Sequence, residues 1–161
     1  MDKIEFVTGG KELLPRVKAL WEKLNRHHQL NNTYFKQHYS TYTFEGRQKK
    51  LLKDATAKLR VILAHDPARG NDVGYCVVSL NTAGVGEIES LYVELEYRKL
   101  GLGDQLMKRS MLWLDDEKAT SRTLSVAEGN EEVLPFYAHY GFYPRRIVLE
   151  YIPPAQKADK A

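Results

Sequence analysis

Residues 98–103, Arg98-Lys99-Leu100-Gly101-Leu102-Gly103, combine charge and glycine between a strand-like run and a helix-like run. Glycine lets the backbone turn tightly and approach a ligand without an intervening Cβ atom. The first N–H groups of a helix lack internal partners and carry the positive end of its dipole. Arg98 and Lys99 add full positive charges. The segment therefore predicts a site that holds a pyrophosphate.

Two other phosphate loops do not fit this spacing. A Walker A loop needs four residues between its glycines and then Gly-Lys-Ser/Thr. A dinucleotide fingerprint needs a third glycine at the position that Leu106 occupies. The turn therefore belongs to another class of phosphate site.

The strand-like run before this turn, residues 85–95, breaks its own alternation. Ile88, Leu91 and Val93 cannot all face one side of a regular strand, because side chains alternate with period two. One additional residue, a bulge near Glu89 and Ser90, restores the parity. It would splay this strand from its neighbour and leave backbone N–H and C=O groups for an extended ligand.

The rest of the chain supplies the elements that must hold this strand and turn. Hydrophobic periodicity predicts helices over 10–28, 44–57, 101–118 and 130–140, and strands over 2–8, 59–64, 73–81, 85–95, 123–127 and 143–152. Pro15 falls in the first turns of its helix, where a missing N–H is tolerated. The aromatic and amide-rich residues 29–40 are interpreted as loop and short helix that could form a lid.

This order of elements predicts an α/β fold, a three-layer domain whose mixed sheet carries helices on both faces. Residues 1–152 are expected to form one domain, and residues 153–161 a frayed tail. The net charge of +3 is too mild to indicate a nucleic-acid partner. The N-terminal residues lack the apolar core of a signal peptide or membrane span, so we expect a cytoplasmic protein without a membrane partner.

The histidines and the one cysteine could support other chemistry, as metal ligands or as a nucleophile. Cys76 lies in an apolar run and is interpreted as a core residue. His27 and His28 are adjacent on a helix and point in different directions, and a solvated helix end accounts for them. No histidine has a Cys, Asp or Glu partner at ligand spacing, so we expect no metal.

Two ordered motifs resemble the GNAT superfamily of N-acetyltransferases. Ile88-x-x-Leu91-x-Val93 followed by Arg98-x-x-Gly101-x-Gly103 is similar to its motif A. The run from Asn130 to Phe142, with Phe136-Tyr137 and Tyr140-Gly141-Phe142, is similar to its motif B. Together they cover roughly residues 85–145, about a third of the chain.

The resemblance implies a GNAT-like fold with a splayed central strand pair that binds acetyl-CoA as cosubstrate. Pantetheine would pair with the backbone of Leu91, Tyr92 and Val93. The pyrophosphate would rest on the N–H groups of Lys99, Leu100, Gly101, Leu102, Gly103 and Asp104, beside Arg98. Asn130 corresponds to the asparagine that contacts pantetheine, and Tyr137 to the tyrosine whose hydroxyl reaches the sulfur. A phenol can give a proton to a leaving thiolate.

An acetyltransferase of this kind also needs a base, because an alkylammonium with a pKa of about 10 holds little free amine at neutral pH. Glu87 and Glu89 project from the splayed strand, and Glu87 occupies a position at which several relatives place their base. Either residue can instead be a solvated carboxylate on the sheet face. A backbone N–H near Tyr92 or Val93 would meet the oxyanion.

The acceptor is the least determined part of this hypothesis. The segment from Asn31 to Tyr42 favours a pocket for a small-molecule primary amine, attacked in a ternary complex. Acetylation of protein lysines or N-termini is one alternative. A non-catalytic acyl-CoA-binding sensor is an alternative of another class, and it would need neither Tyr137 nor Glu87. Both a monomer and a homodimer are compatible with the resemblance.

Overall fold

The structure is a computed structural model that describes residues 3–155. It divides into two compact units. The sheet unit comprises residues 3–25 and 42–125, and the C-terminal unit comprises residues 26–41 and 126–155.

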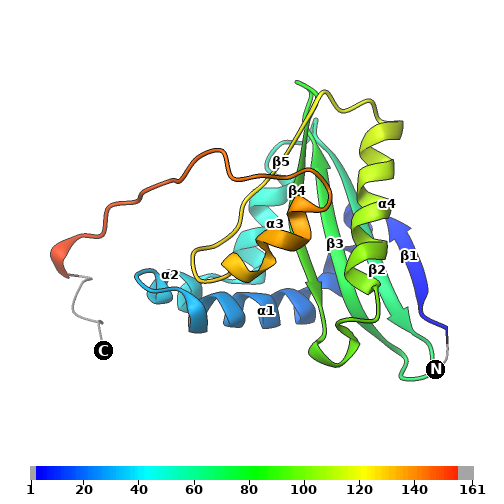
Figure 1. The fold of residues 1–161 in the computed structure, drawn as a ribbon, viewed down its shortest axis with the longest axis horizontal. Coiled ribbons are helices and arrows are strands. Elements are labelled where there is room, and N and C mark those ends of the chain that lie inside the picture. Colours follow the sequence, from blue (N-terminus) through cyan, green and yellow to red (C-terminus); the bar gives the residue numbers. More distant parts are fainter. Residues whose placement is uncertain (1–2, 156–161) are drawn as a thin grey trace. The chain divides into compact units, whose positions relative to one another are not determined.

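The sheet unit is built on a five-stranded mixed sheet in the order β1-β2-β3-β4-β5 (Figure 1). β1 to β4 are antiparallel to one another, whereas β5 runs parallel to β4. The strands are β1 (Glu5–Gly9), β2 (Lys58–Asp66), β3 (Asn71–Leu80), β4 (Val85–Val93) and β5 (Ser121–Leu124). The predicted mixed sheet is confirmed.

Helices cover both faces of this sheet. The helices with residues in the sheet unit are α1 (Leu14–Asn31, as far as Asn25), α3 (Phe44–Leu52) and α4 (Leu102–Asp116), together with the short 3-10 turns η1 (Lys11–Leu13) and η2 (Leu95–Tyr97). α4 packs on β2, β3 and β4, where the Ser110 hydroxyl donates to Cys76 at 3.2 Å. The next residue along β3, Val77, belongs to the opposite core, which α1 and α3 cover. The three layers predicted from the sequence are therefore present.

Close packing under α4 fixes the position of that helix. Leu106, Met107 and Leu114 are fully buried, as the helical spacing predicts. A Cβ atom at Gly86 of β4 would lie 2.6 Å from a methyl carbon of Leu114. The last turn of α4 is therefore packed closely against β4, the strand that precedes the helix along the chain.

The C-terminal unit is held by a short polar network. Asn32 is buried; its side-chain oxygen accepts from the N–H groups of Tyr34 and Phe35 at 3.2 and 2.7 Å. Its side-chain nitrogen donates to the Glu128 carbonyl at 3.1 Å, and the Glu128 carboxylate accepts from Thr33. This unit also contains α2 (Lys36–Thr41), the 3-10 turn η3 (Glu131–Val133) and α5 (Leu134–Ala138).

The helical predictions differ from the structure in their bounds, and the helix expected over 130–140 is the 3-10 turn η3 followed by the short α5. The helix expected over 44–57 ends at Leu52, because Asp54 accepts a 2.9 Å bond from the N–H of Thr56 and closes a turn. The helix expected over 10–28 begins with the 3-10 turn η1 and continues through Asn31, before the short α2. Pro15 lies in the first turn of α1, as predicted.

The predicted closing strand over 143–152 is wrong. No residue from Tyr143 to Ile152 pairs with a strand, and Ile147 and Leu149 are 88% and 90% exposed. Branched and aromatic side chains give this segment a strand-like composition, but a ladder also needs the backbone of a neighbouring strand. Of the predicted tail, residues 156–161 lie outside the described part of the chain.

No helix of residues 3–155 combines the length and apolar character that crossing a lipid bilayer requires.

Candidate functional site

A one-residue bulge separates the two halves of β4. Val77 of β3 lies opposite Ser90 and Val78 lies opposite Ile88, so Glu89 has no partner position on β3. Gly86 and Ile88 before the bulge, and Leu91 and Val93 after it, all take the α4 side. The bulge predicted from the broken alternation is confirmed.

β4 and β5 part at the same place. Their parallel pairing covers only Val85 to Ile88 of β4 and Ser121 to Leu124 of β5. From Glu89 to Val93, no described strand pairs with β4 on the edge away from β3. Backbone groups on this edge are therefore not used by the sheet, which is what an extended ligand needs.

The bulge residue Glu89 is held by two side chains. Arg47 of α3 donates one nitrogen to the Glu89 carboxylate at 2.9 Å and to the Glu89 carbonyl at 3.0 Å. Ser79 of β3 donates its hydroxyl to the other carboxylate oxygen at 2.7 Å. The Glu89 side chain is 15% exposed, so these bonds replace most of its hydration.

Glu87 lies two residues earlier, opposite Ser79. Burial raises the pKa of its carboxyl above the usual 4.5, and the neighbouring charge of Glu89 raises it further. The positive charge of Arg47 acts in the opposite direction. The raised pKa makes the Glu87 carboxylate a stronger proton acceptor than a solvated glutamate.

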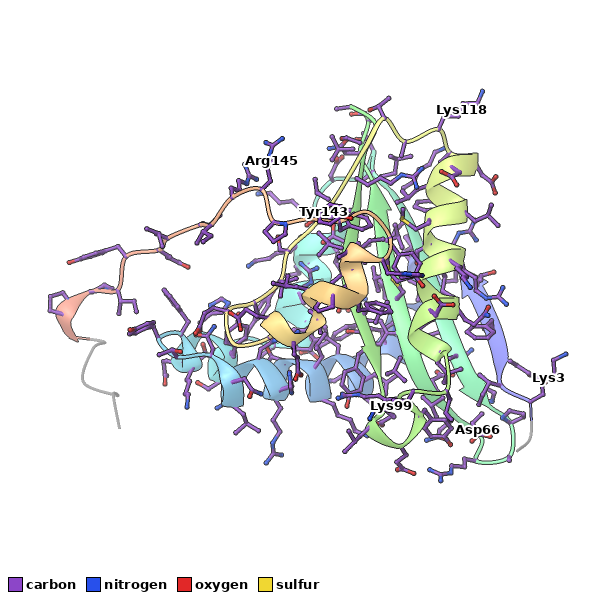
Figure 2. The ribbon with its side chains drawn as sticks, viewed as in Figure 1. Lys3, Asp66, Lys99, Lys118, Tyr143 and Arg145 are labelled. Carbon is purple, nitrogen blue, oxygen red and sulfur yellow. The ribbon has the colours of Figure 1, made fainter. Side chains whose placement is uncertain are left out.

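The glycine turn leads directly into α4. Lys99 and Gly101 have positive φ angles of 64° and 80°, and α4 begins at the next residue, Leu102. The N–H of Gln105 bonds to the Gly101 carbonyl at 3.0 Å, so the N–H groups of residues 102–104 precede the first helical hydrogen bond. Figure 2 shows Lys99 at this end of α4 and Lys118 beyond the other end.

Arg98 has a structural partner of its own. Its Nε donates to the Val93 carbonyl at 2.9 Å, and its guanidinium lies 5.4 Å from the centre of the Tyr92 ring. The N–H of Glu94 bonds to the Val73 carbonyl of β3, so the backbone groups of Tyr92, two residues earlier, also point to β3. The backbone groups of Leu91 and Val93 therefore lie on the free edge, where the Val93 carbonyl already accepts from Arg98. Arg98 stabilises the turn whether or not it also contacts phosphate.

In the C-terminal unit, Asn130 is positioned by His27. The Asn130 side-chain oxygen lies 3.2 Å from His27 Nε2, and His27 Nδ1 lies 3.3 Å from the Asn31 side-chain nitrogen. The imidazole tautomer with its proton on Nε2 satisfies both contacts. The amide nitrogen of Asn130 is then left to donate to a ligand.

Tyr137 lies in α5, a short helix that begins at Leu134 and has Pro135 in its first turn. Its ring packs edge-to-face on Phe136, with the centroids 5.2 Å apart, and its carbonyl accepts from the N–H groups of Tyr140 and Phe142. The side chain is partly buried. Both candidate residues of motif B, Asn130 and Tyr137, thus belong to one compact unit.

The alternative chemistry considered for cysteine and histidine receives no support in residues 3–155. Burial raises the pKa of Cys76 to about 12, so its thiol is a poor nucleophile. No group of three His, Cys, Asp or Glu side chains in this part of the chain could hold a metal ion. His28 is not the solvated residue expected: burial lowers its pKa to about 4, and its Nδ1 is buried without a hydrogen-bond partner.

Sequence reasoning missed Arg47 and the role of His27. Arg47 lies in a charged helix, 42 residues from Glu89, and only the fold brings the two together. His27 was considered as a metal ligand and as a solvated residue, whereas its partner Asn130 lies 103 residues away. No local pattern marks either contact.

The comparisons with known proteins fit this geometry. Residues 21–142 match the family model described as Acetyltransferase (GNAT) family. No curated protein sequence matches the chain significantly. Solved structures match over nearly the whole chain at identities that establish the fold alone.

Three of these structures illustrate the range of TM-scores and sequence identities. A GCN5-related N-acetyltransferase from Ralstonia eutropha JMP134 has a TM-score of 0.70 at 17% identity, covering 93% of this chain and 99% of its own. A ribosomal-protein-alanine N-acetyltransferase from Brucella melitensis biovar Abortus 2308 has a TM-score of 0.63 at 13% identity, covering 92% and 99%. The aminoglycoside N-acetyltransferase AAC(6')-Iy in complex with CoA has a TM-score of 0.62 at 15% identity, covering 92% and 98%.

Proposed function

Because the chain belongs to the GNAT acetyltransferase family, we propose that it transfers an acetyl group from acetyl-CoA to a primary amine of a small molecule. The observation that carries this proposal is the parting of β4 from β5 after Ile88, directly before the glycine turn that begins α4. An unpaired strand edge suits the amides of pantetheine, and a helix N-terminus suits a pyrophosphate.

The sheet unit would hold most of the coenzyme. Pantetheine would pair with the free-edge backbone groups of Leu91, since Tyr92 directs its own to β3 and Arg98 already bonds to the Val93 carbonyl. The pyrophosphate would accept from the N–H groups between Lys99 and Asp104. No side chain needs to move for the Gly101 backbone to be approached, because a Cβ built there meets nothing within 4 Å.

Asn130 would contribute one donor to the coenzyme. His27 occupies its side-chain oxygen, so the interaction that remains is donation from the amide nitrogen. Pantetheine contains two amide carbonyls that can accept such a bond. His27 therefore sets the orientation of Asn130, and with it which of the two amide atoms faces the ligand.

The chemistry would proceed by direct attack in a ternary complex. The Glu87 carboxylate takes one proton from the ammonium, and the neutral nitrogen attacks the thioester carbonyl. The C–N bond forms and the C–S bond breaks. Tyr137 gives its hydroxyl proton to the leaving sulfur, and the second proton that the nitrogen loses restores the Tyr137 hydroxyl. Glu87 returns its proton to water. Of the two backbone candidates, Tyr92 and Val93, the N–H of Val93 lies on the free edge and would stabilise the oxyanion.

The preference for a small acceptor rests on the segment from Asn31 to Tyr42. It is ordered by its own contacts: Asn32 is buried, Thr33 bonds to Glu128, and α2 follows. Such a segment is suited to border a pocket rather than to leave an open groove for a protein tail. The structural relatives include an aminoglycoside acetyltransferase and a ribosomal-protein-alanine acetyltransferase, so peptides belong in the same test.

The test is release of the CoA thiol from acetyl-CoA with a panel of small amines and a panel of peptides. We expect release with small amines and an acetylated amine detected by mass spectrometry. The Gly103→Glu variant, which places bulk and negative charge at the phosphates, should neither bind acetyl-CoA nor release thiol. Acetylation of peptides alone would replace the small acceptor by a protein. Binding of acetyl-CoA without any transfer would indicate a sensor.

A further inference from the structure

The two carboxylates on either side of Ile88 have different surroundings, and Arg47 causes the difference. Arg47 stands in the first turn of α3, where its backbone N–H bonds to the carbonyl of the capping residue Thr43 at 3.0 Å. Its side chain is only 21% exposed and ends at Glu89. A partly buried charge pair of this kind is restricted in its geometry, unlike an exposed one.

The Arg47 side chain holds the bulge by bonding to both the backbone and the side chain of Glu89. One guanidinium nitrogen bonds to the Glu89 carbonyl at 3.0 Å and to the Glu89 carboxylate at 2.9 Å. The bulge leaves that residue without a partner on β3, so α3 supplies what the sheet does not. With Ser79 bound to the other oxygen, each oxygen of the Glu89 carboxylate has a donor. Glu89 is therefore a poor candidate for accepting a proton from a substrate.

Glu87 receives neither of these bonds. The charged groups that act on it are Glu89 from its own strand and Arg47 from α3. The anion of Glu89 makes a second negative charge unfavourable, and Arg47 limits that effect. The two carboxyls therefore differ in their hydrogen bonds: both oxygens of Glu89 have a donor, whereas Glu87 has neither Arg47 nor Ser79 as a donor.

We infer that Arg47 is a positioning residue for acetyl transfer, which fixes Glu89 as the anion of the bulge and leaves Glu87 to accept the proton of the amine. This inference rests on the proposed function. It assigns the base between the two glutamates, which the spacing of the sequence leaves open. It also gives α3 an indirect role in the reaction, since Arg47 acts through Glu89 and does not contact the reacting atoms.

The experiment that tests it does not require a known acceptor. The carboxyl carbons of glutamate are labelled with ¹³C in the full chain, and their titration is followed by NMR with Glu87→Gln and Glu89→Gln assigning the signals. In Arg47→Gln we expect the pKa of Glu87 to rise by about one unit, because a positive charge has been removed. Arg47→Lys keeps the charge and should restore most of the original titration.

Arg16→Gln is the matched control, because Arg16 also forms an ion pair with a partly buried carboxylate, Asp72, at 2.6 Å. It should leave the titration of Glu87 unchanged. Glu89→Gln is the second variant in case Arg47→Gln does not fold. Its amide oxygen can still accept from Arg47 while its amide nitrogen donates to the Ser79 hydroxyl, and the loss of the anion should lower the pKa of Glu87.

Kinetics with an amine from the panel complete the test. Arg47→Gln should lower kcat about tenfold and move the acidic limb of the rate profile to higher pH, with rescue of the limb by Arg47→Lys. A folded Arg47→Gln protein with an unchanged Glu87 titration would overturn the inference. So would an acidic limb that follows the signal of Glu89. Absence of thiol release by the wild type would remove the proposed function instead, and the titration would still report on Arg47.

Discussion

The side-chain oxygen of Asn130 lies 3.2 Å from the Nε2 atom of His27, although 103 residues separate the two along the chain. His27 thereby decides which atom of the Asn130 amide can face a ligand. Removing the imidazole allows the amide to rotate and costs one hydrogen bond. We expect His27→Ala to raise the Kd for acetyl-CoA roughly three- to tenfold, measured by calorimetry.

His139→Ala provides the control, since His139 is exposed on the same unit. It should bind acetyl-CoA as the wild type does. Equal affinities for the His27 variant and the wild type would show that the orientation of Asn130 does not matter for the coenzyme.

Tyr137 is expected to act on turnover rather than on binding. Tyr137→Phe keeps the ring contact with Phe136 and removes only the hydroxyl that would protonate the sulfur. We expect kcat to fall on the order of 10²-fold, with little change in the Kd for acetyl-CoA. Tyr143→Phe, at a residue 73% exposed, should have no effect on either. Full activity of Tyr137→Phe would exclude the hydroxyl as the acid.

The pH dependence should report Glu87. A base must be ionised, and burial together with the charge of Glu89 raises the pKa of Glu87 above 4.5. We therefore expect kcat/KM to decline as pH falls through this raised pKa, and Glu87→Gln to lose on the order of 10²-fold of the rate together with this limb. The exposed Glu22→Gln variant should keep the wild-type profile. A Glu87→Gln profile that retains the limb would place the titrating group elsewhere.

Gly101 permits a test of the turn that separates folding from binding. Gly101 and Gly70 both have positive φ, at 80° and 69°, and neither has an atom within 4 Å of a built Cβ. Alanine at either position should lower the free energy of unfolding by about 1–2 kcal/mol, measured by denaturant titration. Only Gly101→Ala should also weaken binding of acetyl-CoA. Equal affinity in the two variants would argue against phosphates lying at this turn.

Gly129 should be intolerant of any side chain. A Cβ atom there would lie 2.1 Å from the Asn31 carbonyl oxygen, and its φ is +90°. We expect Gly129→Ala to destabilise the C-terminal unit by roughly 3 kcal/mol, from the clash and the backbone strain together. Gly70→Ala carries the strain without the clash and should lose less. A similar loss in both variants would mean that the loop can move away at little cost.

Much of the sheet unit could be predicted from the chain because its signals are local. The broken alternation at Ile88, Leu91 and Val93 located the bulge, and the spacing of Leu106 and Leu114 located the buried side of α4. These patterns depend only on the repeat of a strand or a helix. The turn at Gly101 was equally visible, since positive φ favours glycine.

What could not be predicted depends on contacts between distant residues. The bonds of Arg47 to Glu89 and of His27 to Asn130 leave no trace in spacing, because charged and polar residues on a helix usually face solvent. The strand predicted from Tyr143 to Ile152 is wrong for the opposite reason, because here a local signal is present and the distant contact is missing. Its composition is typical of a strand, but composition cannot supply the neighbouring backbone that a strand requires.

The bulge of β4 also limits how this chain can change over evolution. Glu89 is one residue more than the pairing with β3 requires. The side of the sheet on which Leu91 and Val93 lie therefore depends on the number of residues in β4, not on the type of side chain at position 89. Point substitutions can alter the carboxylate at this position, but they leave the count intact. Only an insertion or a deletion could erase it, and such an event would turn every later residue of the strand to the opposite side at once. The geometry of this edge is thus robust to the commonest class of mutation and open to loss through a rarer one.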